Sequence, residues 1–376
     1  MKLVIWQPNL TPHQFDSFQS IAHKQVFQLE SHVIELDEPI RMKQGWPSVT
    51  NASFPILKIN GFLIFYFYKN IFKAKDCIHI FSGAFGSYKL IFLMHLCAMF
   101  GISFFVITES FSDSAIPYFE RRITLVHCIK KILRPIFYEI NIKLIKKNIY
   151  GVFAISELAA HQWAKFGIST HKIMKYGYFV RKTNCELGGC NQKKNFDGGG
   201  LRIIFIGSLI YTKGLDILIS SVENLLAQGI SISLDIYGPG DIADFKISQQ
   251  KIRYMSVIPF GRSQEIISEY DLLVLPSRYD GWGVVLNEAI NAGIPIICSN
   301  NVGAKVLVET YNIGLVFESN SVSSLMESLL KIYGNQVLYS EYKNNIIKAQ
   351  VDIDPDIVAD IFIDCVSRLS KFNVNC

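Results

Sequence analysis

The sequence has few cysteines, few charged residues and none of the glycine motifs typical of the commonest nucleotide-binding enzymes. Its eight Cys are too sparse for a disulfide scaffold, and only Cys185 and Cys190 lie close together, so we expect reduced thiols in a cytoplasmic chain. No Gly-x4-Gly-Lys-Ser/Thr segment occurs, which excludes a P-loop enzyme at the motif level. No Gly-x-Gly-x-x-Gly follows a strand, which disfavours a nicotinamide dehydrogenase. The apolar run at Met1 is too short for a signal peptide.

Composition favours two folded domains with different charge. Half of the 376 residues are hydrophobic and 18% are charged, which excludes a disordered chain. A chain of this length suits two domains of about 150–200 residues each. Residues 1–190 carry a net charge of +10 and residues 191–376 a net charge of −5. The basic first half suggests contact with an anionic surface or ligand.

Two apolar runs are candidates for membrane-spanning segments. Phe62–Tyr68 is far too short, and Ile91–Thr108 is barely long enough, because a spanning helix needs roughly 18–20 apolar residues. The second run contains His95, Gly101 and Ser103. We therefore expect it to form a buried helix over 89–100 followed by a strand over 103–107.

The first half alternates between strands and helices, which predicts a mostly parallel sheet. Further strands are expected at Lys2–Trp6, Cys77–Phe81 and Val152–Ser156, and a helix should begin at Glu157. Arg121–Tyr150 reads as a long basic helical tract in which Pro135 should cause a break or a kink. This tract is either a solvated face or, given its interleaved Ile, Leu and Val, a membrane-surface contact.

The second half repeats the same alternation more regularly. A glycine-rich segment over 185–200 is expected to be a flexible linker. After it, strands are predicted over 202–206, 231–237, 272–275 and 294–298, and a short one should close at Ile258–Gly261. Helices are predicted over 215–228, 263–270, 284–292 and 355–369. The domains are thus 1–184, 201–350 and a C-terminal helix over 351–376, which should return to the first domain.

The segment Pro276–Pro295 carries the strongest chemical signal. Ligands of parallel sheets bind beyond the carboxyl ends of the strands, here in a cleft between two domains. Gly281 and Gly283 allow close backbone approach, and the free amides of Gly283, Val284 and Val285 at the next helix start form a phosphate cradle. Asp280 can accept hydrogen bonds from sugar hydroxyls, and Glu288 from a ribose diol. Together these features describe a nucleotide-sugar site.

This segment resembles the retaining glycosyltransferases of family 4 with the GT-B fold, the glycosyl transferases group 1. Their signature is an acid, seven residues and a Glu, preceded by Pro-Ser and followed by Glu-Ala and a Gly-x-Pro strand. This chain has Pro276-Ser277, Asp280, Glu288-Ala289 and Gly293-Ile-Pro295. The family usually has Glu where this chain has the shorter Asp280. The resemblance covers about Leu201–Phe317 and implies two Rossmann-like parallel-sheet domains facing a cleft.

The resemblance also implies roles for residues around this segment. Lys213, in a Gly-x5-Lys-Gly pattern that begins at Gly207, would neutralise the diphosphate of the donor as it leaves. Ser208 occupies the usual position of an Arg, for which Arg262 or Arg278 could substitute. The loops at Gly238 and Phe260 would hold the base. The remaining donor-binding candidates are Trp282 and the helix-start residues named above.

The first half would bind the acceptor. Relatives often have a His after the fourth strand, where this chain has Glu109, so we expect Glu109 either to line the reaction centre or to be a loop acid with an ordinary partner. His13 follows the first strand and is interpreted as a turn residue rather than a base. The acids at Asp352, Asp354 and Asp356 resemble a metal motif, but their place before a helix favours capping. We expect no metal.

The resulting hypothesis is a hexosyltransferase that uses a UDP- or GDP-type sugar and retains the anomeric configuration, with Asp280, Lys213 and Glu109 at the reaction centre. The acceptor would be a glycolipid or an oligosaccharide, as in bacterial surface polysaccharide synthesis. The chain would be cytoplasmic and peripheral on the inner face of an anionic membrane, without nucleic-acid partners. A nucleotide-sugar epimerase and a non-catalytic binding module are the alternatives.

Overall fold

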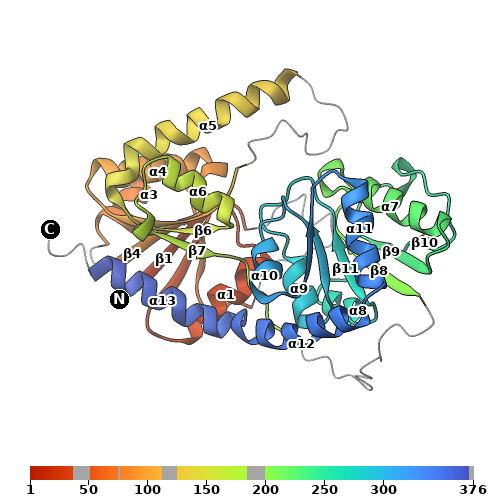
Figure 1. Ribbon diagram of the computed structural model, residues 1–376. Coiled ribbons are helices and arrows are strands. Elements are labelled where there is room, and N and C mark those ends of the chain that lie inside the picture. Colours follow the sequence, from red (N-terminus) through yellow and green to blue (C-terminus); the bar gives the residue numbers. More distant parts are fainter. Residues whose placement is uncertain (37–50, 75–76, 112–124, 184–199, 372–376) are drawn as a thin grey trace. The chain divides into compact units, whose positions relative to one another are not determined.

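The computed structural model describes residues 1–36, 51–74, 77–111, 125–183 and 200–371 (Figure 1). The chain divides into two compact units. The first comprises Met1–Ser114, Cys128–Val180 and Pro355–Cys376, and the second comprises Ala115–His127 and Arg181–Asp354. The segment predicted as a linker over 185–200 lies outside the described residues, apart from Gly200.

The first unit is built on a seven-stranded parallel sheet with the order β3-β2-β1-β4-β5-β6-β7. The strands are β1 (Lys2–Gln7), β2 (Gln28–Val33), β3 (Ile56–Lys58), β4 (Cys77–Ser82), β5 (Phe104–Glu109), β6 (Ile149–Ile155) and β7 (Ile173–Tyr176). All four strands predicted in this half are present. The direction of strand addition reverses between β1 and β4, so the sheet is doubly wound.

Helices cover both faces of this sheet (Figure 1). One face carries α3 (Leu63–Phe67), the π-helical turn η1 (Tyr68–Phe72), α4 (Tyr88–Met99), α5 (Leu125–Ile145) and α6 (Glu157–Lys165). The other face carries α1 (Pro12–His23) and α13 (Pro355–Lys371), which pack together. The ring of Phe362 on α13 stacks on Phe153 of β6 at a centroid distance of 4.3 Å. The prediction that the C-terminal helix returns to the first domain is therefore confirmed.

The apolar run at Ile91–Thr108 divides into α4 and β5, as predicted from its internal polar residues. In the described ranges of the chain, no helix combines the length and the apolar character needed to cross a membrane.

The helix α5 is continuous through Pro135, so the expected break does not occur. Proline removes the hydrogen bond to the carbonyl four residues earlier, which here belongs to Lys131. Lys131 is exposed, so water can satisfy that carbonyl.

The second unit is a six-stranded parallel sheet with the order β10-β9-β8-β11-β12-β13. The strands are β8 (Leu201–Ile206), β9 (Ile232–Tyr237), β10 (Ile252–Tyr254), β11 (Leu272–Leu275), β12 (Ile296–Ser299) and β13 (Gly314–Phe317). The helices are α7 (Leu215–Ala227), α8 (Ser263–Ile267), α9 (Val285–Ala292), α10 (Lys305–Tyr311), α11 (Val322–Tyr333) and α12 (Gln336–Asp352). The central strands are apolar runs buried on both faces, typical of parallel sheets.

Two element boundaries differ from prediction. The strand expected to close at Ile258–Gly261 is β10, which ends earlier at Tyr254 as a three-residue edge strand. The strand after α9 begins at Ile296, beyond Pro295, because Pro has no amide to donate to the ladder. Gly293 ends α9 as predicted, in the left-handed conformation with a φ of 78°. Two Rossmann-like parallel-sheet units are thus confirmed as the fold.

Candidate functional site

The candidate site lies at the carboxyl ends of β8 and β11 in the second unit. The chain runs from β8 through α7 to β9 on one side, and from β11 through α9 to β12 on the other. The loops after β8 and β11 therefore lie where the direction of strand addition reverses, which is where doubly wound sheets bind their ligands. Lys213 belongs to the first loop and Asp280 to the second.

Hydrogen bonds and a close backbone approach hold these two loops together. The amide of Arg278 donates to the carbonyl of Thr212 at 2.7 Å, and its Nη1 atom donates to the carbonyl of Tyr211 at 2.8 Å. Gly214 has a φ of 67°, and a Cβ atom there would lie 2.1 Å from the carbonyl oxygen of Pro276. Only glycine permits this close approach. The position of Lys213 is therefore coupled to the loop that carries Asp280.

Lys213 and Asp280 form an ion pair at this switch point. The Nζ atom of Lys213 lies 2.6 Å from Oδ2 of Asp280, and the exposed fractions of the two side chains are 21% and 13%. The backbone of Asp280 is held independently, because its amide donates to Asn301 and its carbonyl accepts from the amide of Gly303, both at 3.0 Å. The structure thus brings two predicted catalytic residues into direct contact.

The start of α9 presents backbone amides next to Asp280. The first amide that bonds back along the chain is that of Leu286, which donates to Gly283 at 2.9 Å. The amides of Gly283, Val284 and Val285 precede it, and amides at this position have no carbonyl partner within the helix. Gly283 has a φ of 89°. This arrangement suits a phosphate or diphosphate.

Glu288 lies in the first turn of α9 and keeps part of its surface accessible. Burial of its carboxyl group raises its pKa to about 7, although the hydroxyl of Ser263 partly offsets this effect by donating to Oε1 at 2.7 Å. Glu288 can therefore change its charge near neutral pH. The sequence offered no signal for Ser263, which stands at the start of α8.

The loops predicted to hold a base, at Gly238 and Phe260, follow β9 and β10, and the loop at Gly207 and Ser208 follows β8. A Cβ atom on Gly238 would lie 1.9 Å from the carbonyl oxygen of Gly207, so these two loops touch through backbone alone. Ser208 is partly exposed at the same edge. Phe260 lies in the loop between β10 and α8 and has an exposed fraction of 56%.

Arg262 and Arg278, the two candidates to replace the Arg that the family usually has at the position of Ser208, have different surroundings. Arg278 is buried, with two hydrogen bonds to Asp216 at 2.8 and 2.7 Å and its guanidinium 3.9 Å from the ring centroid of Tyr211. Arg262 is exposed and pairs with Glu265 at 2.8 Å. Arg278 therefore joins the two loops, whereas Arg262 stays at the surface.

The indole of Trp282 is 97% buried, and its Nε1 atom donates to Asn287 at 2.8 Å. The amide of Ala304 donates to the carbonyl of Trp282 at 2.7 Å. The side chain thus packs inside the unit and anchors the loop beside Gly281, rather than facing solvent.

In the first unit, Glu109 lies at the carboxyl end of β5 and is exposed. The hydroxyl of Tyr178 donates to Oε1 of Glu109 at 2.5 Å, and the ring of His13 lies 6.5 Å from that of Tyr178. His13 is in the first turn of α1 rather than in a free turn. No sequence signal pointed to Tyr178.

The acids near the C-terminus lie at a helix boundary. Asp352 ends α12, and Asp354 directly precedes α13, the position expected for capping. Within the described ranges, no group of three or more His, Cys, Asp or Glu side chains could hold a metal ion.

Comparison with known proteins places the candidate site inside a recognised domain. Residues 191–349 match the family model described as Glycosyl transferases group 1. A glycogen synthase of Thermodesulfovibrio yellowstonii is 31% identical over 149 residues, which cover 37% of this chain and 30% of that protein. The UDP-Gal:alpha-D-GlcNAc-diphosphoundecaprenol alpha-1,3-galactosyltransferase of Escherichia coli is 31% identical over 110 residues, 27% of each chain. The chain thus spans less than a third of either relative.

Solved structures match over nearly the whole chain. The crystal structure of HepE from Anabaena in complex with UDP has a TM-score of 0.71 with this chain at 13% identity. The alignment covers 98% of this chain and 100% of that chain. The likeness confirms the predicted GT-B type of fold for both units.

Proposed function

We propose that the protein is a glycosyltransferase that moves a sugar from a nucleotide-sugar donor to an acceptor hydroxyl. The single observation that carries the proposal is the Lys213–Asp280 pair beside the start of α9, inside the segment that matches the glycosyl transferases group 1 model. A cation, backbone amides and a carboxylate at a switch point match the charges of a nucleoside diphosphate bonded to a sugar.

In this proposal the diphosphate of the donor lies against the amides of Gly283–Val285 and Lys213. As the bond between the anomeric carbon and the phosphate oxygen breaks, negative charge grows on the diphosphate, and Lys213 stabilises it. Asp280 holds Lys213 before the donor arrives and then accepts hydrogen bonds from the sugar. Glu288 accepts from the ribose hydroxyls. Because Lys213 and the helix start supply positive charge, we propose no metal.

We further propose retention of configuration, as in family 4. The acceptor oxygen bonds to the anomeric carbon on the face that the diphosphate leaves, and its proton passes to the departing phosphate oxygen. The donor is a UDP- or GDP-sugar; UDP is supported by the ligand of the Anabaena structure. We assign Glu109 to the acceptor side of the reaction, where Tyr178 orients its carboxylate.

The proposed acceptor is a lipid-linked sugar or an oligosaccharide in bacterial surface polysaccharide synthesis, such as O-antigen or capsule, at the inner face of the cell membrane. The name of the Escherichia coli relative describes a diphosphoundecaprenol-linked acceptor, which supports the lipid-linked form. The epimerase alternative has no support among the relatives described above.

The test is product analysis with a panel of UDP- and GDP-sugars and undecaprenol-linked or free glycan acceptors. We expect free nucleoside diphosphate together with a new glycoside whose anomeric proton coupling matches that of the donor. An isomerised donor without transfer would establish the epimerase instead. Nucleotide binding without turnover across the panel would establish the binding module.

A further inference from the structure

The outer face of α5 is apolar, although it faces solvent. Its exposed large apolar side chains have exposed fractions between 45% and 65% and are Val126, Ile129, Ile132, Leu133, Ile136, Phe137, Ile140 and Leu144. Most of them recur at three- or four-residue intervals, so they lie along one side of the helix. Ile142 and Ile145 point the other way, into the core. A surface helix normally directs its apolar side toward the core, so an exposed apolar stripe on the outer side of α5 departs from the usual amphipathic pattern.

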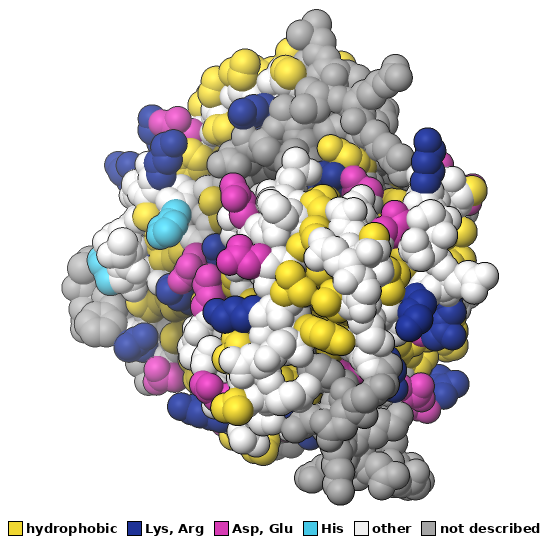
Figure 2. Space-filling view, turned by 45° about the vertical axis from the view of Figure 1, so that its right-hand side comes forward, with side chains coloured by type: hydrophobic (Ala, Val, Ile, Leu, Met, Phe, Trp, Pro, Cys, Tyr) yellow, Lys and Arg dark blue, Asp and Glu magenta, His cyan; other side chains and the backbone are white. Residues whose placement is uncertain are grey.

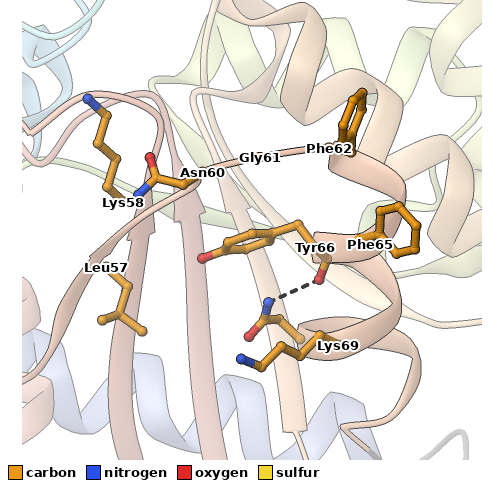
Figure 3. Close-up of a pocket in the computed structure, with 9 residues that line it drawn as sticks. Leu57, Lys58, Asn60, Gly61, Phe62, Phe65, Tyr66 and Lys69 are labelled. Carbon is orange, nitrogen blue, oxygen red and sulfur yellow. Dashed lines mark hydrogen bonds between the residues drawn. The ribbon is translucent and has the colours of Figure 1, made fainter.

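The neighbouring helices share this feature. Near α3 and η1, the exposed side chains are Phe62, Ile64, Phe65, Tyr68 and Phe72, with exposed fractions from 44% to 81%. On and after α4, they are Tyr88, Phe92, Met99 and Phe100, from 40% to 77%. A pocket of about 570 Å³ is lined by residues of β3 and α3 and the turn between them. Figure 3 shows that Tyr66 points toward the strands and that the rings of Phe62 and Phe65 lie on the opposite side of the helix.

The exposed surfaces of α3, η1, α4 and α5 adjoin one another on the same side of the first unit. Phe100, at the end of α4, packs against Phe67 and Phe72 at ring centroid distances of 5.5 and 5.2 Å. On the other side of α4, His95 bonds to Asn141 of α5 at 2.8 Å. All three helices bury their inner sides in the same core cluster of the first unit. Their outer sides therefore form a single apolar and aromatic surface, which we call the outer layer.

The outer layer is also basic. Over the face that Figure 2 shows, Lys and Arg side chains stand near Asp and Glu side chains. By contrast, the residues of α3, η1, α4 and α5 include one acid, Glu139, which pairs with Lys143 at 2.7 Å. Their bases are Lys69, Lys89, Lys130, Lys131, Arg134 and Lys143.

We propose that the outer layer docks on the surface of an anionic lipid bilayer, with α5 lying in the headgroup region. Exposed apolar and aromatic side chains flanked by bases are the combination that binds this interface. The charge argues against a second copy of the chain as the occupant, since a two-fold contact would place this basic surface against itself. A bilayer of anionic lipids supplies the opposite charge. This inference does not rest on the proposed transferase activity.

The test is cosedimentation of the full chain with vesicles of phosphatidylcholine containing phosphatidylglycerol, compared with phosphatidylcholine alone. The test variant is L133E/I140E/L144E on α5, whose side chains are 57%, 54% and 65% exposed. The matched control is V337E/I347E/V351E on α12, with exposed fractions of 80%, 65% and 55%. We expect the α5 variant to bind at least tenfold more weakly and the α12 variant to stay within twofold of the wild type.

A second series tests the charge without touching apolar residues. Each of K130Q, K131Q and R134Q should weaken binding about fivefold at low salt, and high salt should remove the difference. Equal binding of all variants, or no preference for phosphatidylglycerol, would overturn the proposal. A third result would also overturn it. In this case the wild type would not bind vesicles and would form a dimer in analytical ultracentrifugation, and L133E/I140E/L144E would be monomeric. Thermal unfolding of each variant shows whether its fold is intact, and the Lys and Arg variants keep the test valid if the triple variant is unstable.

Discussion

The amino group of Lys213 lies 2.6 Å from the carboxylate of Asp280, although the two residues are 67 positions apart and follow different strands. The pair stands where β8 and β11 diverge, so the sheet topology rather than the local sequence creates it. Without a donor, each charge neutralises the other. In the proposed function, a bound diphosphate competes with Asp280 for Lys213. Replacing either residue should therefore affect donor binding and sugar transfer differently.

We expect D280N to lower kcat on the order of a hundredfold, because the sugar loses a charged acceptor in the transition state. The same variant should bind free UDP or GDP at least as tightly as the wild type, because Lys213 is no longer shared with a carboxylate. Steady-state kinetics and isothermal titration measure these two quantities. The control is D241N, in which an exposed helix-capping acid is replaced by an equally good cap. A parallel loss of UDP binding and kcat would contradict this role.

We expect K213A to weaken both nucleoside diphosphate binding and transfer, the latter about 10²–10³-fold. In this variant the carboxylate of Asp280 faces the diphosphate without compensation. The double variant K213A/D280N should therefore recover part of the lost UDP affinity, so that the two effects are not additive. Strict additivity in a double-mutant cycle would show that the ion pair plays no part in donor binding. K251A, at an exposed position of the same unit, is the control.

Because the pKa of Glu288 lies near neutrality, we expect the affinity for the donor to depend on pH. Its pKa is about 7, so the carboxyl group is mostly protonated at pH 5.5 and mostly ionised at pH 8.5. The ionised form accepts hydrogen bonds from both hydroxyls of a ribose, so affinity should rise with pH and have its midpoint near 7. E288Q should bind more weakly at high pH and show no such rise. A rise of equal size in E288Q would assign the titration to the ligand.

The carboxyl group of Glu288 should also make the free energy of unfolding depend on pH. Its pKa in the folded state lies above the ordinary value of 4.5, so its contribution to stability is full below pH 4.5 and is lost as the pH rises through 7. Relative to E288Q, the wild type should therefore lose up to about 3 kcal/mol of unfolding free energy between pH 4.5 and 8. Urea unfolding at several pH values measures this difference. A constant difference would show that the carboxyl group titrates normally.

The sequence predicted β8, α7, β9, β11, α9 and β12 because these strands are mainly apolar and three of them end directly at Gly207, Gly238 or Pro276. It gave no prediction for α10, β13, α11 and α12. Asp280 and Glu288 were found from their places after a predicted strand and near a helix start, and Lys213 from the resemblance to the glycosyltransferase family. The side chains that contact Glu288 and Arg278 were not predictable from the sequence. Ser263 reaches Glu288 and Asp216 reaches Arg278 only through tertiary packing.

The first unit was harder to predict because its polar residues are buried. Strand β2 contains Glu30, Ser31 and His32, all at most 9% exposed. His32 bonds to Glu30 on one side and to the hydroxyl of Tyr66 on the other, at 2.5 and 2.7 Å. These partners satisfy polar groups that would otherwise exclude the strand from a core. A search for apolar runs therefore misses β2.

Arg278 and Arg262 form a matched pair of variants. R278L removes a buried guanidinium that donates hydrogen bonds to Asp216, to Asn320 and to the carbonyl of Tyr211, so we expect a loss of about 2–3 kcal/mol of unfolding free energy. R262L breaks a solvent-exposed pair with Glu265, so it should leave the unfolding free energy close to that of the wild type. Urea unfolding compares the two. A larger loss in R262L would contradict the structural role assigned to Arg278.

Gly283 and Gly293 flank α9 and allow the geometry of the phosphate cradle to be tested. Both have positive φ values, 89° and 78°. A Cβ atom on Gly283 would lie 2.9 Å from both Leu275 and Val302, whereas one on Gly293 would have nothing nearer than 3.9 Å. G293A should therefore cost about 1–2 kcal/mol for backbone strain alone. G283A should cost about 1–3 kcal/mol more, because the loop must also move away from the core.

That movement displaces the amides that would bind the diphosphate. G283A should therefore lose affinity for UDP or GDP under conditions in which it is still folded, whereas G293A, at the far end of the same helix, should keep the wild-type affinity. Titration of both variants at a temperature well below their unfolding midpoints separates binding from stability. If G283A binds as tightly as G293A, the start of α9 does not hold the diphosphate, and Lys213 would have to bind it without the helix.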